Sequence, residues 1–328
     1  MACLSHPMTI DEYTSLIEAG NGHQIDKRSL GKLLSLVENE QKGSKTLLKT
    51  LHRQAGRAYR IGVTGPPGAG KSTLVSGLVE LLAREAKVGV VAVDPTSPFS
   101  GGAVLGDRFR MNEVAQHSSV FIRSVASRGS AGGLSRTAYR LADVMDACGY
   151  DFILFETVGV GQAEIEITEH ADTTIVVLVP ESGDGIQAMK AGLMEIADLF
   201  VINKSDRDQA DTIKREIENI LELRTIEETG WKPPVLKTIG TQKQGIQELA
   251  NGIQDHRNHM VSTGVLDTRR KNRIRHEMMT LLRERIDLLW RKKKSEEEVE
   301  NYVEAVFLKK VSVYEVADRL FEEYLRFR

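Results

Sequence analysis

The stretch that decides the fold is YRIGVTGPPGAGKS, residues 59 to 72. Its first part, Tyr59 to Thr64, predicts a short buried strand, and the run from Ser72 to Glu85 has helical character. Between them lies Gly65-Pro66-Pro67-Gly68-Ala69-Gly70-Lys71-Ser72, a complete G-x-x-x-x-G-K-S phosphate loop. Glycines let backbone N–H groups converge on a phosphate, and the helix N-terminus adds partial positive charge there. The flanking strand and helix favour this interpretation over a glycine-rich turn that matches by chance.

Two side chains of this loop have expected partners. Lys71 would reach the β- and γ-phosphates of a nucleotide, and the Ser72 hydroxyl would ligate Mg²⁺. The loop therefore predicts a nucleoside triphosphate, without saying which base it carries.

A second motif predicts the base. Leu199 to Ile202 reads as a buried strand and ends in Asn203-Lys204-Ser205-Asp206, an N-K-x-D box. The Asp206 carboxylate can accept from both N1–H and the exocyclic amine of guanine, whereas adenine would present a lone pair at N1. Asn203 and the Lys204 stem would hold the loop and cover the base. The alternative is a polar turn at a strand end, but the spacing from the phosphate loop favours GTP and GDP.

Composition narrows the class of protein. The chain has 328 residues, a formal net charge of −2 and 41% hydrophobic residues, so we expect a full core and no nucleic-acid partner. No apolar run approaches the ~20 residues of a membrane span. The first residues lack the features of a signal or transit peptide, and the two cysteines, Cys3 and Cys148, form no C-x-x-C. These features predict a cytoplasmic enzyme with no membrane partner.

The chain divides into three expected parts: an N-terminal helical extension at 1–57, a nucleotide-binding domain at 58–255 and a C-terminal helical part at 256–328. The extension should contain two amphipathic helices, around residues 33–37 and 47–51. In the central part, strands are predicted at 59–64, 88–94, 120–125, 152–156, 173–179, 199–202 and 235–239, with helices at 134–147, 186–196 and 210–223. This alternation predicts an α/β fold of the P-loop NTPase type, a mostly parallel sheet flanked by helices. Its ligand should lie at the carboxyl ends of the strands.

The C-terminal part has apolar residues at helical spacing, among them Ile274, Met278, Leu282 and Ile286. These faces either pack on the central domain or form a dimerisation arm. We favour the arm, because so small a helical appendage needs another surface to cover its apolar stripes.

Magnesium binding and hydrolysis require carboxylates near the phosphate loop. Glu156 ends the apolar run Phe152 to Phe155 and begins a Glu-x-x-Gly motif, where P-loop NTPases hold a metal-bound water. Asp94 ends another predicted strand and is either a Mg²⁺ ligand or a cap of the turn before Pro95. Asp107 lies in a glycine-rich segment and either enters the metal site as a switch residue or belongs to a plain surface loop.

These motifs together carry a family resemblance. Val93-Asp94-Pro95-Thr96-Ser97-Pro98, Gly106-Asp107-Arg108, Glu156-Thr157-Val158-Gly159-Val160-Gly161-Gln162 and the N-K-S-D box resemble the MeaB/ArgK family of P-loop GTPases over roughly residues 10 to 320. The resemblance implies a homodimer that hydrolyses GTP as a chaperone of a cobalamin-dependent acyl-CoA mutase, typically methylmalonyl-CoA mutase. It would gate delivery of adenosylcobalamin and protect or reactivate the mutase.

The resemblance also implies roles for individual residues. Gly65 to Thr73 would bind phosphates, with Lys71, Glu156 and Asp107 as catalytic residues. Guanine would be bound by Asn203, Lys204 and Asp206, and by the loop Thr238-Ile239-Gly240. Ser72, Asp94, Asp107 and Glu156 would surround Mg²⁺. Asp184, Gln187 and Lys190 would belong to a third switch loop that contacts the mutase, the alternative being an ordinary strand-to-helix loop.

Other functions remain open at this point. A nickel-insertion GTPase commonly carries histidine-rich tracts or paired cysteines, whereas this chain has eight scattered histidines. A kinase for an amino-acid transport binding protein is an older label of the same family, and Asp206 argues against ATP. No water-positioning residue is identified, since Gln162 is equally suited to capping a helix. We therefore expect slow intrinsic turnover.

Overall fold

The computed structural model describes residues 9–94, 112–126, 136–157, 166, 169–180, 191–223, 230–293 and 296–325. The chain forms two compact units, one reaching Arg270 and the other beginning at Lys271. The predicted boundary near residue 255 falls within helix α12 (Ile246–Ser262).

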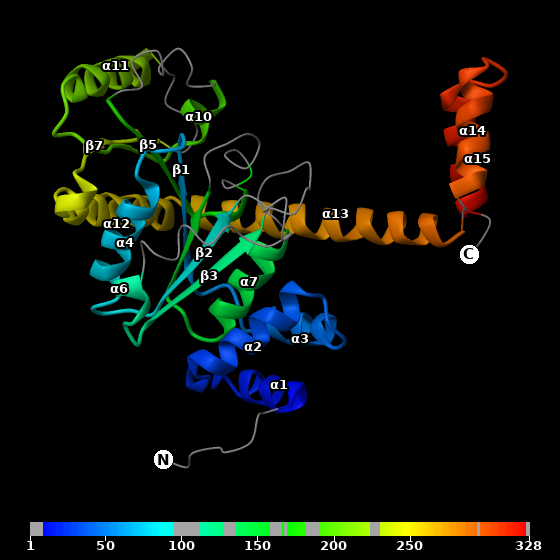
Figure 1. The fold of residues 1–328 in the computed structure, drawn as a ribbon, viewed down its shortest axis with the longest axis horizontal. Coiled ribbons are helices and arrows are strands. Elements are labelled where there is room, and N and C mark those ends of the chain that lie inside the picture. The colour runs from blue at the N-terminus through cyan, green and yellow to red at the C-terminus, as the bar shows by residue number, and fades with distance from the viewer. Residues whose placement is uncertain are drawn as a thin grey trace. The chain divides into compact units, whose positions relative to one another are not determined.

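A parallel sheet of seven described strands forms the centre of the first unit (Figure 1). Its strands are β1 (Tyr59–Thr64), β2 (Val88–Asp94), β3 (Val120–Ala126), β4 (Phe152–Glu156), β5 (Thr173–Leu178), β6 (Leu199–Ile202) and β7 (Val235–Lys237). They lie in the order β3-β2-β4-β1-β5-β6-β7, and every pair is parallel. The predicted P-loop NTPase fold is confirmed. Strands β3, β5 and β7 end within one or two residues of their predicted ends.

Helices cover both faces of this sheet because alternate strand residues point to opposite sides. On one face α4 (Lys71–Leu82) and α12 pack on alternate residues of the central strands, including Val90, Leu154, Val177 and Val201. On the other face α7 (Arg136–Ala147) covers residues such as Val91 and Phe155. Beyond β5, helices α10 (Ala191–Ile196) and α11 (Ala210–Leu223) pack on residues such as Val176 and Phe200. The sheet is therefore buried between two helical layers.

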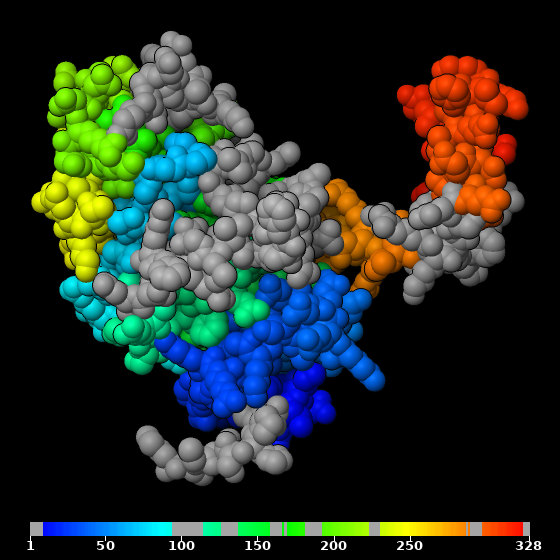
Figure 2. Space-filling view, viewed as in Figure 1, coloured from blue at the N-terminus to red at the C-terminus, as the bar shows by residue number. Residues whose placement is uncertain are grey.

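The N-terminal extension contains three α-helices: α1 (Ile10–Glu18), α2 (Lys27–Glu38) and α3 (Ser44–Leu51). Only α2 and α3 were expected. Helix α1 is short, and a reciprocal pair of hydrogen bonds between Thr9 and Glu12 caps it. The extension shares one hydrophobic core with α7. In Figure 2 its blue surface lies next to the green surface of the central part. Half-buried ion pairs of Arg123 with Glu38 and of Arg140 with the exposed Glu40 join it to the sheet and to α7.

Short elements complete the first unit. They are the 3₁₀ turns η1 (Gly22–Gln24) and η2 (Gly240–Gln242) and helix α6 (Asn112–Ala115). The predicted helices at 134–147 and 186–196 begin in residues outside the described ranges, and their described parts are α7 and α10.

The second unit is helical. It comprises the greater part of α13 (Val265–Lys293), then α14 (Glu296–Phe307) and α15 (Val313–Leu325). Among its described side chains, Val316 is the only apolar one that is buried. Large apolar side chains are exposed on all three helices, for example Met278 (59%), Phe307 (80%) and Phe321 (62%). No helix in the described ranges is long and apolar enough to cross a membrane.

Candidate functional site

The predicted nucleotide motifs meet at one edge of the sheet, where the parallel strands end. The phosphate loop follows β1, and Glu156 ends β4 beside it, opposite Val63. The loop needs glycine at its first position. Gly65 has φ 139°, and a Cβ there would collide with the backbone carbonyl of Val177 on β5. The start of the phosphate loop is therefore held close against β5.

Lys71 and Ser72 are buried at the start of α4, where the loop becomes helix. The Lys71 Nζ donates to the carbonyls of Gly65 (2.8 Å) and Pro66 (3.0 Å), so the ammonium lies over the loop where phosphates are expected. The Ser72 Oγ donates to Glu156 Oε1 at 2.5 Å. A hydroxyl and a carboxylate oxygen in contact at a helix N-terminus are a donor set that suits a hard cation.

Asn203 connects three parts of the site. Its Nδ2 donates to the carbonyl of Ala69 in the phosphate loop at 2.8 Å. Its Oδ1 accepts from the Thr238 hydroxyl (3.1 Å) and from the Gly240 N–H (3.0 Å). The side chain is buried and all three contacts are made to residues of the predicted nucleotide site. The N-K-S-D box is thus joined to the phosphate loop and to the loop after β7.

The rest of the N-K-S-D box forms a tight turn. Lys204 has φ 57°, in the left-handed region, and the Ser205 N–H donates to the Thr238 carbonyl at 3.1 Å. Asp206 is exposed on this turn, while Ile239 and the buried Gly240 form the adjacent loop. The turn that carries Asp206 is therefore held by Asn203 and by the Ser205 N–H, which both bond to neighbouring loops.

Several predicted residues cannot be placed. Asp107, Gln162, Asp184, Gln187 and Lys190 lie outside the described residues. Asp94 is the last residue of β2, which pairs with β4 at the same edge, but its side chain is outside what the structure describes.

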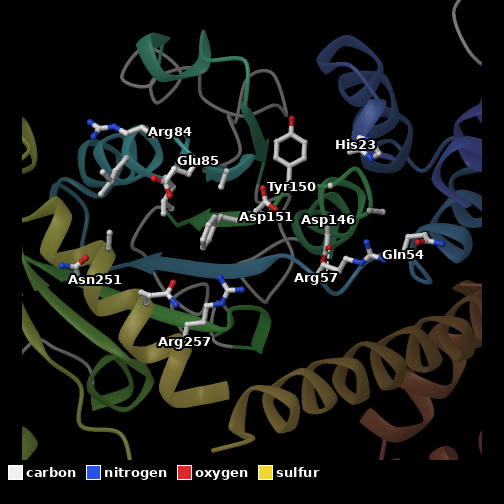
Figure 3. A pocket seen from close by; sticks show the side chains of 18 of the residues that line it. His23, Gln54, Arg57, Arg84, Glu85, Asp146, Tyr150, Asp151, Asn251 and Arg257 are labelled. Atoms are coloured by element: carbon white, nitrogen blue, oxygen red, sulfur yellow. Dashed lines mark hydrogen bonds between the residues drawn. The ribbon is translucent and has the colours of Figure 1, made fainter. Parts of the chain in front are cut away.

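The opposite edge of the sheet, where the strands begin, holds an open cavity of about 870 Å³ (Figure 3). Its walls come from the N-terminal extension, the end of α4, the start of β4 and helix α12. Arg57, Arg84 and Arg257 line it from separate elements, and their guanidinium groups do not converge. The cavity lies at the strand starts, whereas the predicted nucleotide motifs lie at the strand ends. Its charged side chains do not point toward a common centre where a ligand could bind.

The sequence interpretation missed a group of charged residues at this amino edge. We call it the amino-edge cluster: Asp172, Asp198, His256, Arg269 and Arg270. The available signal was an aspartate directly before each of two apolar strands and a pair of consecutive arginines. Burial opposes the charge on Asp198, but the Arg269 guanidinium and hydrogen bonds from His256 and Arg269 hold the pKa of Asp198 well below its ordinary value. Nearby, burial raises the pKa of Tyr59 to about 12.

A phosphate loop after the first strand and an N-K-x-D box after β6 of a parallel sheet define the class of P-loop GTPases. The family model described as "Methylmalonyl Co-A mutase-associated GTPase MeaB" matches residues 30–296. The chain belongs to this family and is a GTP-hydrolysing enzyme.

Relatives agree with this assignment over nearly the whole chain. A putative GTPase of Pyrococcus horikoshii is 43% identical, covering 96% of this chain and 98% of its own. The GTPase ArgK of Escherichia coli is 38% identical over 85% of this chain and 83% of its own. A solved structure described as a LAO/AO transport system kinase superposes with a TM-score of 0.73 at 29% identity, covering 98% of this chain and all of its own.

Proposed function

We propose that this GTPase is a chaperone of a cobalamin-dependent acyl-CoA mutase, with methylmalonyl-CoA mutase as the expected client. GTP binding and hydrolysis would gate the delivery of adenosylcobalamin and protect or reactivate the mutase in the cytoplasm. The observation that carries this proposal is a connected phosphate loop and N-K-S-D box in a chain of a family described as mutase-associated.

In this proposal, residues of the carboxyl edge divide the chemistry between them. Gly65 to Thr73 bind the phosphates through backbone N–H groups, and Lys71 moves from the loop carbonyls to the β- and γ-phosphates. Asn203, Lys204 and Asp206 bind guanine, with Thr238 to Gly240 behind them. Hydrolysis then depends on holding the phosphates in line and on balancing the charge that develops on the transferred group, which Lys71 does.

Mg²⁺ fits the oxygen donors at this edge. Ser72 and Glu156 would hold it, Glu156 through a bound water, and we propose Asp94 and Asp107 as further members of its shell. When bound, the ion would neutralise negative charge on the nucleotide phosphates.

We propose that the second unit forms the dimer. Its three helices expose large apolar side chains, and so much exposed apolar surface on a small helical unit favours association. Leu282→Asp, at a half-exposed position on α13, should give a monomer by sedimentation equilibrium, while Lys271→Ala on the same helix should remain dimeric. A wild-type chain that is monomeric at micromolar concentration would contradict the arm.

The test of the chaperone function is GTP hydrolysis with and without a purified cobalamin-dependent acyl-CoA mutase from the same organism, with ATP as control. We expect slow turnover alone and marked stimulation by the mutase, because a partner that orders the switch segments supplies the missing positioning. Fast single turnover without any partner, or hydrolysis indifferent to the mutase, would contradict the proposal and move the client question to metal insertion.

The kinase alternative has one observation in its favour, the description of the structurally similar protein. The same assay can test it with γ-labelled GTP and ATP. Label that appears on a co-purified binding protein, with no free phosphate released, would favour a kinase.

A further inference from the structure

Helix α13 carries two consecutive arginines that bind two aspartates at the amino edge of the sheet. Asp172 precedes β5 and Asp198 precedes β6, so the two carboxylates lie at the starts of neighbouring strands. Arg269 and Arg270 are the last two residues of the first unit. Each arginine binds one aspartate through two nitrogens, which is the strongest geometry available to this pair.

The Arg269 pair holds the start of β6. Its two terminal nitrogens donate to the Asp198 oxygens at 2.8 and 3.0 Å, and one of them also donates to the Asp172 carbonyl at 2.9 Å. Asp198 Oδ2 also accepts from the Thr174 N–H at 2.7 Å, and His256 Nε2 lies 3.3 Å from Asp198 Oδ1. The Asp198 carbonyl accepts from the indole N–H of Trp231 at 2.8 Å. The residue before β6 is therefore held from several directions.

The Arg270 pair holds the starts of β1 and β5. The Asp172 carboxylate is fully buried and accepts from the Arg60 backbone N–H at 3.0 Å and from Arg270 at 3.0 and 3.3 Å. Arg270 also donates to the carbonyls of Gly56 (2.7 Å) and Ala58 (3.1 Å), directly before β1. One guanidinium thus joins the entry of the strand that leads to the phosphate loop with the entry of its neighbour.

These strands are short and lead directly to the nucleotide motifs. β6 has four residues, with Asp198 before its first and Asn203 after its last, a span of roughly 16 Å at a rise of ~3.3 Å per residue. Asn203 is in turn bonded to the phosphate loop and to Gly240. β1 has six residues and ends at the phosphate loop. A strand held at both ends in a packed sheet transmits a shift at one end to the other.

We propose that Arg269 and Arg270 are positioning residues for GTP binding at the opposite edge of the sheet. Arg269 fixes the position of β6 in the sheet by holding Asp198 at its start. Because β6 leads directly to the N-K-S-D box, Arg269 thereby positions that box. Arg270 sets β1 against β5, and through them the phosphate loop. The inference rests on GTP being the nucleotide and is independent of the mutase partner.

The two arginines should therefore differ in which part of the nucleotide they affect. Inosine diphosphate lacks the exocyclic amine of guanine but carries the same phosphates. The ratio of the Kd values for IDP and GDP therefore reports how well the N-K-S-D box recognises that amine, with the phosphate contribution cancelled. Arg269→Gln should raise the Kd for GDP about tenfold and lower the IDP/GDP ratio, a coupling of ordinary size for distant sites. Arg270→Gln should weaken GDP and IDP equally and leave the ratio unchanged.

The measurement is displacement of a fluorescent GDP analogue from the full chain, well below the melting temperature of each variant. Lys271→Ala, an exposed neighbour on the same helix, is the matched control and should bind as the wild type does. Arg269→Lys keeps the charge but loses the planar fork, so it should give an intermediate IDP/GDP ratio. A residue with a merely structural role would lower the melting temperature without changing the Kd for GDP or for IDP.

Removing one partner of a buried pair can prevent folding because it leaves an unpaired charge. The double variant Asp198→Asn, Arg269→Gln avoids this and keeps a neutral hydrogen-bonding pair, so it serves if Arg269→Gln does not fold. It should show the same fall in the IDP/GDP ratio. Folded variants with the wild-type Kd for GDP, or with a uniform loss at both arginines and no change in ratio, would overturn the proposal.

Discussion

The two edges of the sheet are built from different interactions. At the carboxyl edge, polar side chains contact loop backbone or one another across short distances: Lys71 lies on loop carbonyls, Ser72 on Glu156, and Asn203 on Ala69. At the amino edge, Asp172 and Asp198 are neutralised by arginines and accept strand N–H groups as well. The first arrangement can exchange its contacts for those of a ligand, and the second cannot without leaving a buried charge. The residues expected to bind the nucleotide and the ion pairs that fix the strands therefore lie at opposite ends of the same strands.

The largest test of this difference is Lys71→Ala. The ammonium should account for much of the phosphate affinity, since charge-assisted bonds in such a site are strong, and we expect the Kd for GDP to rise about 10³-fold. Fluorescent-nucleotide titration measures it, with Lys45→Ala on the exposed face of α3 as control. Retained micromolar affinity would contradict the phosphate-loop assignment.

The next effect sharpens the role of the guanine box. Asp206→Asn replaces an acceptor with a donor, so guanine loses two charged hydrogen bonds while xanthine, which has an oxygen at C2, gains a partner. We expect the Kd for GDP to rise about 10²-fold and the Kd for XDP to fall. Because Asp206 is exposed, the melting temperature of the nucleotide-free chain should not change. Unaltered preference for GDP over XDP would place guanine recognition elsewhere.

A pH series tests the amino edge. The pKa of Asp198 in the folded chain lies below its ordinary value near 3.8, so its contribution to the free energy of unfolding is fully present above that value. It is lost as the pH falls below about 3.8 toward the folded pKa, and should amount to about 2 kcal/mol for a paired aspartate of this kind. Urea unfolding between pH 7 and 3 should show the first part of this loss, about 1 kcal/mol by pH 3, as the difference from the double variant Asp198→Asn, Arg269→Gln. Parallel pH profiles would show that the pair does not hold the fold.

The smallest effect is expected at the surface. Glu80 on α4 and Lys243, which directly follows η2, form a 2.6 Å ion pair, with side chains 42% and 61% exposed. Water and salt screen such a pair, so Glu80→Gln should change the free energy of unfolding by less than about 0.5 kcal/mol. A larger loss in thermal unfolding at 0.15 M salt would mean that the contact between α4 and the loop after η2 stabilises the fold more than an exposed ion pair normally does.

The local pattern predicted most of the fold. Each predicted strand is present, because buried parallel strands are continuous apolar runs bounded by turns. Helix α1 was missed because nine residues with a few apolar positions give a weak periodic signal, and its capping box is what fixes it. For the site, the sequence selected Ser72, Glu156 and Asn203, which the structure brings to one edge. Their roles, and those of Asp94, Asp107 and the third switch loop, stay predictions.

What the sequence determined by itself is the chemistry that a few adjacent residues can specify. The phosphate loop and the N-K-S-D box are each a continuous stretch of chain. Spacing within each motif therefore already fixes which backbone groups and side chains face a ligand. Only the tertiary structure decided which distant groups meet. Asn203 reaches Ala69 across 134 positions, and Arg269 reaches Asp198 across 71. The order β4-β1-β5-β6 places these elements side by side. A charged side chain takes the partner that burial brings within reach, and no local pattern encodes that choice.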